Sequence, residues 1–271
     1  MKYKQIISDF DGTIFSHTSM TIPQNVKTAI ENYRKAGGRF VLCTGRMYTA
    51  IKKYALDLGL NGEILCVQGS ACYNLDDDTE LFSNDLPYEE SLRLAKFLEE
   101  KGWIYQFYHD LRMFTEFENR YTDAYQEMTG ITAVITKTKV SELIEKESFS
   151  AHKFIVMTEP EEAEERISII KKEFPDFDVS QSSPIYIEVV DKDSGKGNGV
   201  KKLSEYLGFS LDETAVFGDE TNDYYMLKEA ELACVPENAV SIVKEVADYI
   251  YPHVDIGGAS EIITKIINDE V

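Results

Sequence analysis

The sequence has few cysteines, few positive charges and no long run of apolar residues. Only four cysteines occur among 271 residues, and none forms a CxxC pair. A zinc-binding or disulfide framework is therefore not expected. The cysteines lie mostly in apolar, strand-like runs, which predicts buried, reduced thiols. The longest apolar runs, such as Phe40 to Cys43, are far too short to cross a bilayer, so we expect a soluble protein.

Positive charge is scarce: 28 Lys and Arg stand against 48 Asp and Glu, giving a net charge of −20. Such a surface repels nucleic acid and anionic membranes, so neither is expected as a partner. It also repels phosphorylated metabolites, so a phosphate site would need a local positive pocket of metal ion, lysine and backbone N–H groups. The N-terminal segment lacks the apolar core and cleavage site of a secretory signal, which predicts a cytoplasmic location.

The length of the chain favours two domains or one domain with a large insert. Apolar strand-like runs at Gln5–Ser8, Phe40–Cys43 and Ile64–Val67 alternate with helical patterns that begin at Pro23 and near Tyr48. This alternation is typical of a parallel sheet covered on both faces. We therefore expect an α/β fold with a doubly wound, mostly parallel sheet.

The same alternation of strands and helices returns near the C-terminus, after a segment of different composition. The expected late elements are a helix at Lys196–Leu207, a strand at Thr214–Phe217, a helix at Asp223–Ala230 and a strand at Leu232–Val235. Between the two blocks, residues 81–183 are richer in aromatic and charged residues and mix helical with strand-like patterns. We expect residues 1–80 and 184–271 to form one domain and residues 81–183 an inserted α+β domain.

Two aspartates, Asp9 and Asp11, directly follow the first predicted strand. An extended chain would aim both carboxylates the same way, at the edge of the sheet where ligands bind in open α/β folds. Two carboxylates so close repel each other unless a cation or a shared proton relieves them. The pair therefore indicates a metal site or a general acid, although Asp-Gly is also a common turn pair.

Thr44 and Gly45 end the second apolar strand and open a helix, where a hydroxyl and free N–H groups can hold phosphate oxygens. A Thr before a helix is also commonly an N-cap. Lys196 stands between glycines at the start of another predicted helix. Glycines let the backbone approach a ligand and the lysine supplies a cation, but a flexible loop has a similar composition.

A fourth group lies in an acidic loop after the Thr214–Phe217 strand and contains Asp219, Asn222 and Asp223. So many oxygen ligands in one turn suit Mg²⁺. A capped helix start would have a similar composition.

These four elements, each at the C-terminal end of a separate predicted strand, together resemble the haloacid dehalogenase superfamily of phosphatases. The length and position of the insert resemble the Cof-type branch of sugar-phosphate phosphatases, whose cap interrupts a Rossmann-like core between the second and third motifs. The resemblance covers the whole chain. It implies a Mg²⁺-dependent phosphatase that hydrolyses a small phosphorylated metabolite, such as a sugar phosphate, through an aspartyl-phosphate.

The resemblance also assigns roles to individual residues. Asp9 matches the nucleophile, and Asp11 matches the general acid that later activates water as a base. The matched Mg²⁺ ligands are Asp9, the backbone carbonyl of Asp11 and Asp219, with Asp223 in support. The residues that match the phosphate-binding groups are Thr44, Gly45, Lys196 and Asn222. The chain has Gln68-Gly69 where many members have Asn-Gly, so a substrate contact of the family at that position does not carry over.

Three alternatives remain on the sequence alone. A phosphomutase of the same superfamily would use Asp9 and Asp11 in the same way but return phosphate to its substrate. A non-catalytic phosphosugar-binding protein could keep the fold, although it has no use for a nucleophile paired with an acid. A nucleotide-dependent dehydrogenase would have Gly-x-Gly-x-x-Gly after the first strand, and this chain has no such turn there.

Overall fold

The computed structural model describes all 271 residues, which divide into two compact units. The core unit comprises Met1–Phe82 and Gly195–Val271, and the insert unit comprises Ser83–Ser194. The second boundary lies beyond the one expected after Ser183. Strand β11 (Tyr186–Asp191) pairs with β9 and β10 of the insert unit. The insert unit therefore extends further along the sequence than the composition suggested.

The core unit contains a five-stranded sheet in which all paired strands are parallel. In spatial order its strands are β14 (Tyr249–Tyr251), β13 (Leu232–Pro236), β12 (Thr214–Phe217), β1 (Gln5–Ser8) and β2 (Arg39–Leu42). Ile7 lies beside Val41 on one neighbour and Val216 on the other. Because every strand runs the same way, the carboxyl ends of all five lie at one edge.

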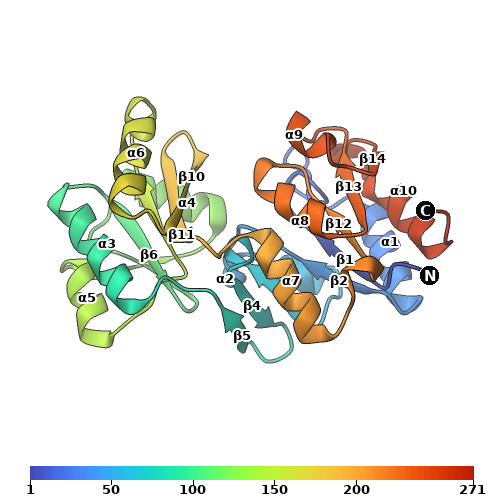
Figure 1. The fold of residues 1–271 in the computed structure, drawn as a ribbon, viewed down its shortest axis with the longest axis horizontal. Coiled ribbons are helices and arrows are strands. Elements are labelled where there is room, and N and C mark those ends of the chain that lie inside the picture. The colour runs from blue at the N-terminus through green and yellow to red at the C-terminus, as the bar shows by residue number, and fades with distance from the viewer. The chain divides into compact units, whose positions relative to one another are not determined.

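Helices cover both faces of this sheet, which confirms the predicted doubly wound α/β fold. On one face, α7 (Lys196–Leu207), α8 (Tyr224–Glu229) and α9 (Ser241–Lys244) share a buried apolar cluster with β1, β2, β12 and β13. Figure 1 shows α7 and α8 side by side over these strands. Helices α1 (Gln24–Lys35) and α10 (Ala259–Ile267) pack against each other and against the sheet.

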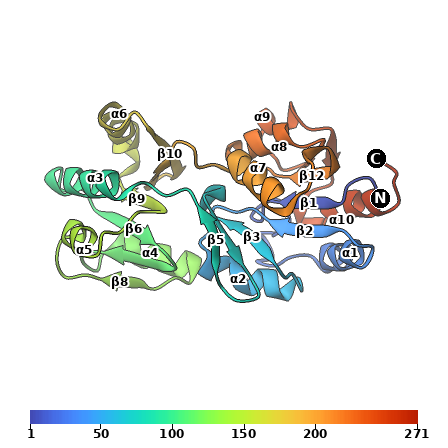
Figure 2. The same cartoon turned by 60° about the horizontal axis from the view of Figure 1, so that its bottom comes forward.

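The third predicted strand belongs to a separate small sheet beside β2 (Figure 2). This small sheet follows helix α2 (Tyr48–Asp57) in the chain. Its strands are β3 (Glu63–Cys66), β4 (Ala71–Asn74) and β5 (Glu80–Ser83). Strand β3 pairs antiparallel with β4 and joins β2 only through a parallel bridge between Cys43 and Leu65. A tight reversal at Val67–Gly69 separates β3 from β4 and comes close to the site described below.

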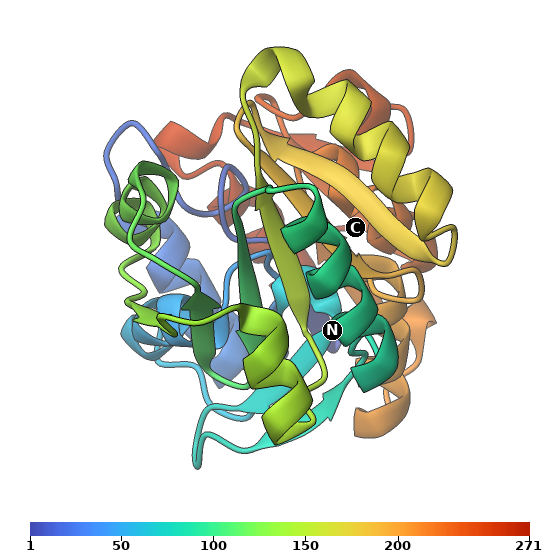
Figure 3. The same cartoon turned by 90° about the vertical axis from the view of Figure 1, so that its left-hand side faces the viewer.

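The insert unit contains a six-stranded, mostly antiparallel sheet. In spatial order its strands are β10 (Phe177–Ser183), β11, β9 (Lys153–Met157), β6 (Tyr105–His109), β7 (Arg112–Thr115) and β8 (Ala133–Ile135). Helices α3 (Tyr88–Glu100), α5 (Val140–Glu147) and α6 (Ala163–Glu173) lie over one face of the sheet, as Figure 3 shows. Their apolar sides enclose the core of the unit. Helix α4 (Arg120–Thr129) contributes no residue to that core, and its Tyr125 packs against Tyr108 and Tyr186.

The two ends of the insert unit are tied to each other within that unit. The Ser194 hydroxyl donates to the backbone oxygen of Asn84 at 3.1 Å. The Asn84 side chain in turn donates to Asp191 at 3.4 Å. The points where the chain enters and leaves the insert unit are therefore neighbours.

The four cysteines, Cys43, Cys66, Cys72 and Cys234, are all free and buried, which confirms the prediction of buried thiols. Their burial raises the pKa of each thiol well above its ordinary value, so none is set up as a nucleophile. None of the helices is both long enough and apolar enough to span a bilayer.

Candidate active site

The candidate site forms where three neighbouring strands of the core unit end. Asp9 follows β1, and its backbone N–H donates to Phe217 at the end of β12 at 2.8 Å. Thr44 lies two residues after β2, and Asp219 lies two residues after β12. The parallel register therefore brings segments far apart in sequence to one edge of the sheet, as the sequence pattern predicts.

Lys196, the first residue of α7, lies at the centre of this group and is only 2% exposed. Its ammonium group donates to Asp9 Oδ1 and to Asp223 Oδ1, each at 2.6 Å. Burial by itself would lower the pKa of Lys196, but the charges of Asp223 and Asp9 outweigh it and hold this pKa above its ordinary value. Lys196 therefore stays positively charged at the bottom of the site.

Asp219 approaches the turn after β1. The Thr13 hydroxyl donates to Asp219 Oδ1 at 2.6 Å and lies 3.5 Å from Asp9 Oδ2. Gly12 has a φ of 74°, and a Cβ atom at this position would overlap Asp219 Oδ2. The glycine of the Asp-Gly-Thr sequence thus has two reasons to be a glycine: its backbone conformation and the space that the carboxylate occupies.

Both carboxylate oxygens of Asp223 are already engaged. Oδ2 accepts from the backbone N–H groups of Asp219 at 2.8 Å and Glu220 at 2.9 Å. Oδ1 accepts from Lys196. Asp223 therefore holds its own loop in shape and orients the lysine at the same time.

The three aspartates fit a divalent cation with a preference for oxygen ligands. One oxygen each from Asp9, Asp219 and Asp223 lies within 4.8 Å of the other two. Burial raises the pKa of Asp9 to about 7, although Lys196 opposes the shift. Burial, with the charge of Asp9, raises the pKa of Asp219 to about 8. Three buried carboxylates around one lysine leave an excess of negative charge, which a cation such as Mg²⁺ would offset.

Asp11 makes a separate ion pair. Its carboxylate accepts from Arg46 Nε at 2.7 Å and from Arg46 Nη2 at 2.6 Å, a bidentate arrangement. The guanidinium carbon lies 5.0 Å from the ring centre of Phe10, 5.5 Å from that of Phe15 and 5.4 Å from that of Tyr54. No sequence pattern predicts this role for Arg46, and its position directly after Thr44 and Gly45 is the one signal that points to it.

The expected phosphate-binding residues come from three elements. Thr44 is buried, and its hydroxyl accepts from the backbone N–H of Arg46 at 3.2 Å. Gly45 lies next to the side chain of Gln68. Asn222 is exposed and donates to Gln68 Oε1 at 2.8 Å. Gln68 is thus a neighbour of two expected phosphate-binding residues, which sequence reasoning did not anticipate.

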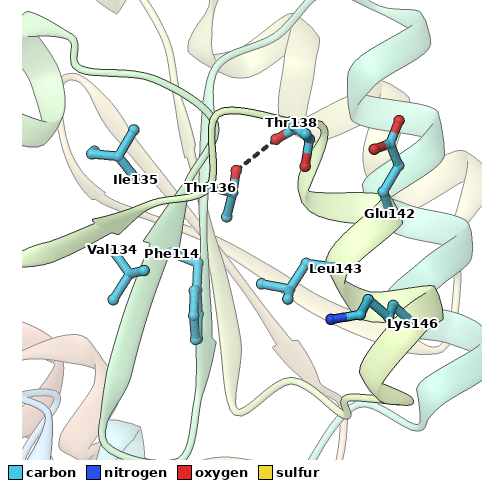
Figure 4. A pocket seen from close by; sticks show the side chains of 8 residues that line it. All are labelled: Phe114, Val134, Ile135, Thr136, Thr138, Glu142, Leu143 and Lys146. Atoms are coloured by element: carbon cyan, nitrogen blue, oxygen red, sulfur yellow. Dashed lines mark hydrogen bonds between the residues drawn. The ribbon is translucent and has the colours of Figure 1, made fainter.

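A cavity of about 410 Å³ is lined by residues of the insert unit (Figure 4). Its walls come from β7, β8 and α5 and the segment between the last two, and the lining residues are Phe114, Val134, Ile135, Thr136, Thr138, Glu142, Leu143 and Lys146. Among these residues, the Thr136 hydroxyl donates to the backbone oxygen of Thr138 at 2.5 Å. The lining contains no cluster of acidic residues, so the candidate chemistry lies in the core unit.

Comparison with known proteins agrees with this geometry. The family model described as haloacid dehalogenase-like hydrolase matches residues 6–263. The 5-amino-6-(5-phospho-D-ribitylamino)uracil phosphatase YcsE of Bacillus subtilis is 25% identical, over 91% of this chain and 89% of its own.

Solved structures show the same fold. TM0651 from Thermotoga maritima aligns with a TM-score of 0.89 and 24% identity over 97% of both chains. The HAD subclass IIB sugar phosphatase BT4131 aligns with a TM-score of 0.82 and 22% identity, over 97% of this chain and 98% of its own. The family match runs from β1 into α10 and includes every segment of the site, and the chain therefore belongs to the haloacid dehalogenase-like hydrolases.

Proposed function

We propose that this hydrolase is a Mg²⁺-dependent phosphatase that acts on a small phosphorylated metabolite through an aspartyl-phosphate on Asp9. The observation that carries the proposal is the buried Lys196, which binds Asp9 on one side and Asp223 on the other. A relative named as a phosphatase and a structural neighbour named as a sugar phosphatase support the reaction class. The strongly negative charge of the chain favours a small soluble substrate over nucleic acid or membrane.

Asp9 would act as the nucleophile. Lys196 fixes Oδ1, which leaves Oδ2 to attack phosphorus and form the aspartyl-phosphate while the bond to the leaving oxygen breaks. Water then attacks the same phosphorus atom, which releases inorganic phosphate and restores the carboxylate. The fixed charge of Lys196 stabilises the phosphoryl oxygens in both steps.

Asp11 would move the proton. Its carboxyl group protonates the leaving alkoxide in the first step, and the resulting carboxylate takes a proton from the attacking water in the second. Arg46 occupies both Asp11 oxygens in the structure. Because a guanidinium binds a carboxylate more strongly than a neutral carboxyl, the acid form of Asp11 holds Arg46 less tightly.

The residues that we propose would hold a metal ion are Asp9 and Asp219, with the backbone carbonyl of Asp11. Asp223 would support them without direct ligation, since both of its oxygens are already engaged. Bound Mg²⁺ would supply positive charge between the carboxylate nucleophile and the phosphate. Thr44, Gly45 and Asn222 would hold the phosphoryl oxygens together with Lys196.

The test is phosphate release from a panel of phosphorylated metabolites and an aryl phosphate, with Mg²⁺ and with EDTA. We expect Mg²⁺-dependent release that falls by a factor of roughly 1,000 or more in Asp9→Asn, because the nucleophile is lost. Asp212→Asn, which changes an exposed aspartate of the same unit, should leave release unchanged.

Two outcomes would contradict the proposal. Equal release by wild type and Asp9→Asn would remove Asp9 from the chemistry. No release from any substrate by folded, Mg²⁺-loaded protein would remove the phosphatase. Isomerisation of a sugar phosphate would then point to a mutase, and binding without any turnover to a phosphosugar-binding protein.

A further inference from the structure

The segment Val67–Gly69 has an unusual backbone. Val67, Gln68 and Gly69 have φ values of 52°, 60° and 80°, so three successive residues lie in the left-handed region. For a β-branched residue such as Val67 this conformation is strained. Strained positions persist only where their surroundings enforce them, and they cluster at functional sites.

Two elements of the candidate site hold this segment in place. The Val67 N–H donates to the Arg46 oxygen at 2.9 Å, and the Gln68 N–H donates to the Thr44 oxygen at 3.0 Å. On the other side, a Cβ atom at Gly199 would lie 2.5 Å from the Gly69 oxygen. The segment is therefore bonded to the loop after β2 and packed closely against the first turn of α7, which carries Lys196.

The side chain of Gln68 contacts a third part of the candidate site, the loop after β12 that contains Asn222. Its Oε1 accepts from Asn222 Nδ2 at 2.8 Å, and its Nε2 lies 2.6 Å from the position that a Cβ atom of Gly45 would take. An asparagine amide has two N–H donors, so the bond to Gln68 leaves one of them for an oxyanion. Because Asn222 is exposed, a fixed partner is what limits its rotation.

We propose that Gln68 is a positioning residue for phosphate binding, which holds the Asn222 amide in the orientation that binds a phosphoryl oxygen. The strained backbone directs the Gln68 side chain across Gly45 to Asn222, so the strain serves the binding geometry. The inference rests on the proposed function in one respect, namely that Asn222 contacts the phosphoryl group.

The test is the dissociation constant for inorganic phosphate in the presence of Mg²⁺, measured by calorimetry. Gln68→Met keeps the length of the side chain but cannot accept from Asn222, and it should weaken binding about fivefold, the worth of one neutral hydrogen bond. Asn222→Ala should weaken binding at least as much. The double variant should bind no more weakly than Asn222→Ala, because Gln68 acts through Asn222.

Gln68→Gly separates positioning from a merely structural role. Glycine adopts a positive φ without strain, so this variant should melt at a higher temperature than wild type while binding phosphate about fivefold more weakly. A side chain kept only for stability would show the opposite trend. Gln24→Met, an exposed glutamine at the start of α1, is the matched control and should change neither quantity.

Equal phosphate affinity in wild type, Gln68→Met and Gln68→Gly would overturn the inference, and so would additive losses in the double variant or an absence of phosphate binding by wild type. Turnover of an aryl phosphate by wild type tests the proposed function separately. A protein that turns over substrate with unchanged affinity in the Gln68 variants would refute the role of Gln68 alone. A protein without turnover that shows the expected affinities would refute only the phosphatase.

Discussion

At Lys196, a single buried charge compensates two buried carboxylates. Lys196→Met would leave the buried carboxylates of Asp9 and Asp223 without this counter-ion. Breaking a buried ion pair from one side typically destabilises a protein by about 3–5 kcal/mol, and we expect a loss of this size in the free energy of unfolding. Urea denaturation of the metal-free protein measures it.

Lys201→Met is the matched control because it lies on the same helix and pairs with Glu229 at 3.0 Å at the surface. That pair is partly exposed, so its loss should change stability by less than about 1 kcal/mol. Equal losses of stability in the two variants would show that Lys196 does not stabilise the protein by neutralising buried carboxylates.

Single residues also mark the limit of what the sequence could predict. The carboxyl ends of parallel strands must meet, so the approach of Asp9, Asp219 and Asp223 followed from the alternation of strands and helices. Lys196 instead follows β11 of the antiparallel sheet in the insert unit, so strand order alone did not predict its place beside them. The partner of Asp11 did not follow, because the pairing with Arg46 depends on side-chain directions after two different strands. The roles proposed for these residues in catalysis stay predictions until they are tested by substitution.

Among the elements, the turn after β1 combines two constraints on Gly12. Gly12→Ala would place a methyl group against Asp219 and also impose a positive φ on alanine. We expect a loss of about 2–4 kcal/mol in stability from overlap and strain together, and weaker Mg²⁺ binding because Asp219 must move. Thermal melts with and without Mg²⁺ measure both effects.

Gly37→Ala isolates the backbone contribution. Gly37 has a φ of 91°, but nothing lies within 4 Å of the position of its Cβ atom. This variant should lose about 1 kcal/mol through strain alone and keep the full thermal shift on adding Mg²⁺. If Gly12→Ala also keeps the full shift, Asp219 does not hold the metal ion.

The elements that the sequence predicted best are those with a simple periodicity. Strands β1 and β12 and helix α7 have the bounds that their apolar patterns indicated. The run at Ile64–Val67 was placed in the parallel sheet, whereas β3 pairs antiparallel with β4. A short apolar run fits a buried strand of either kind, and the deciding feature, the left-handed reversal at Val67–Gly69, involves residues that do not usually adopt that conformation.

For the whole molecule, the buried carboxylates link stability to pH. Without metal, Asp9 and Asp219 have pKa values of about 7 and 8 in the folded state, against 3.8 for an ordinary aspartate. The folded protein therefore keeps protons that the unfolded chain releases, and its stability should fall as pH rises from about 4 to 8. Metal binding needs the deprotonated carboxylates and should strengthen over the upper part of this range.

Thermal melts between pH 5 and pH 9 in EDTA and in Mg²⁺ test this linkage. The melting temperature in EDTA should decline towards pH 8, relative to an Asp219→Asn variant, and the increase caused by Mg²⁺ should grow over the same interval. A Mg²⁺ shift that does not depend on pH would mean that neither aspartate releases a proton when the ion binds.

The paired ends of the insert unit have a consequence for how such a chain can change. Asn84 and Ser194, near the two ends of the insert, are hydrogen-bonded neighbours. The insert therefore joins the chain of the core unit in the way that a single surface loop would. Lengthening, shortening or replacing that loop requires no rethreading of the parallel sheet, and loop-closure entropy grows only slowly with length. The insert can thus be replaced as a unit, while the strand order that brings the aspartates together and the helix that begins at Lys196 both remain.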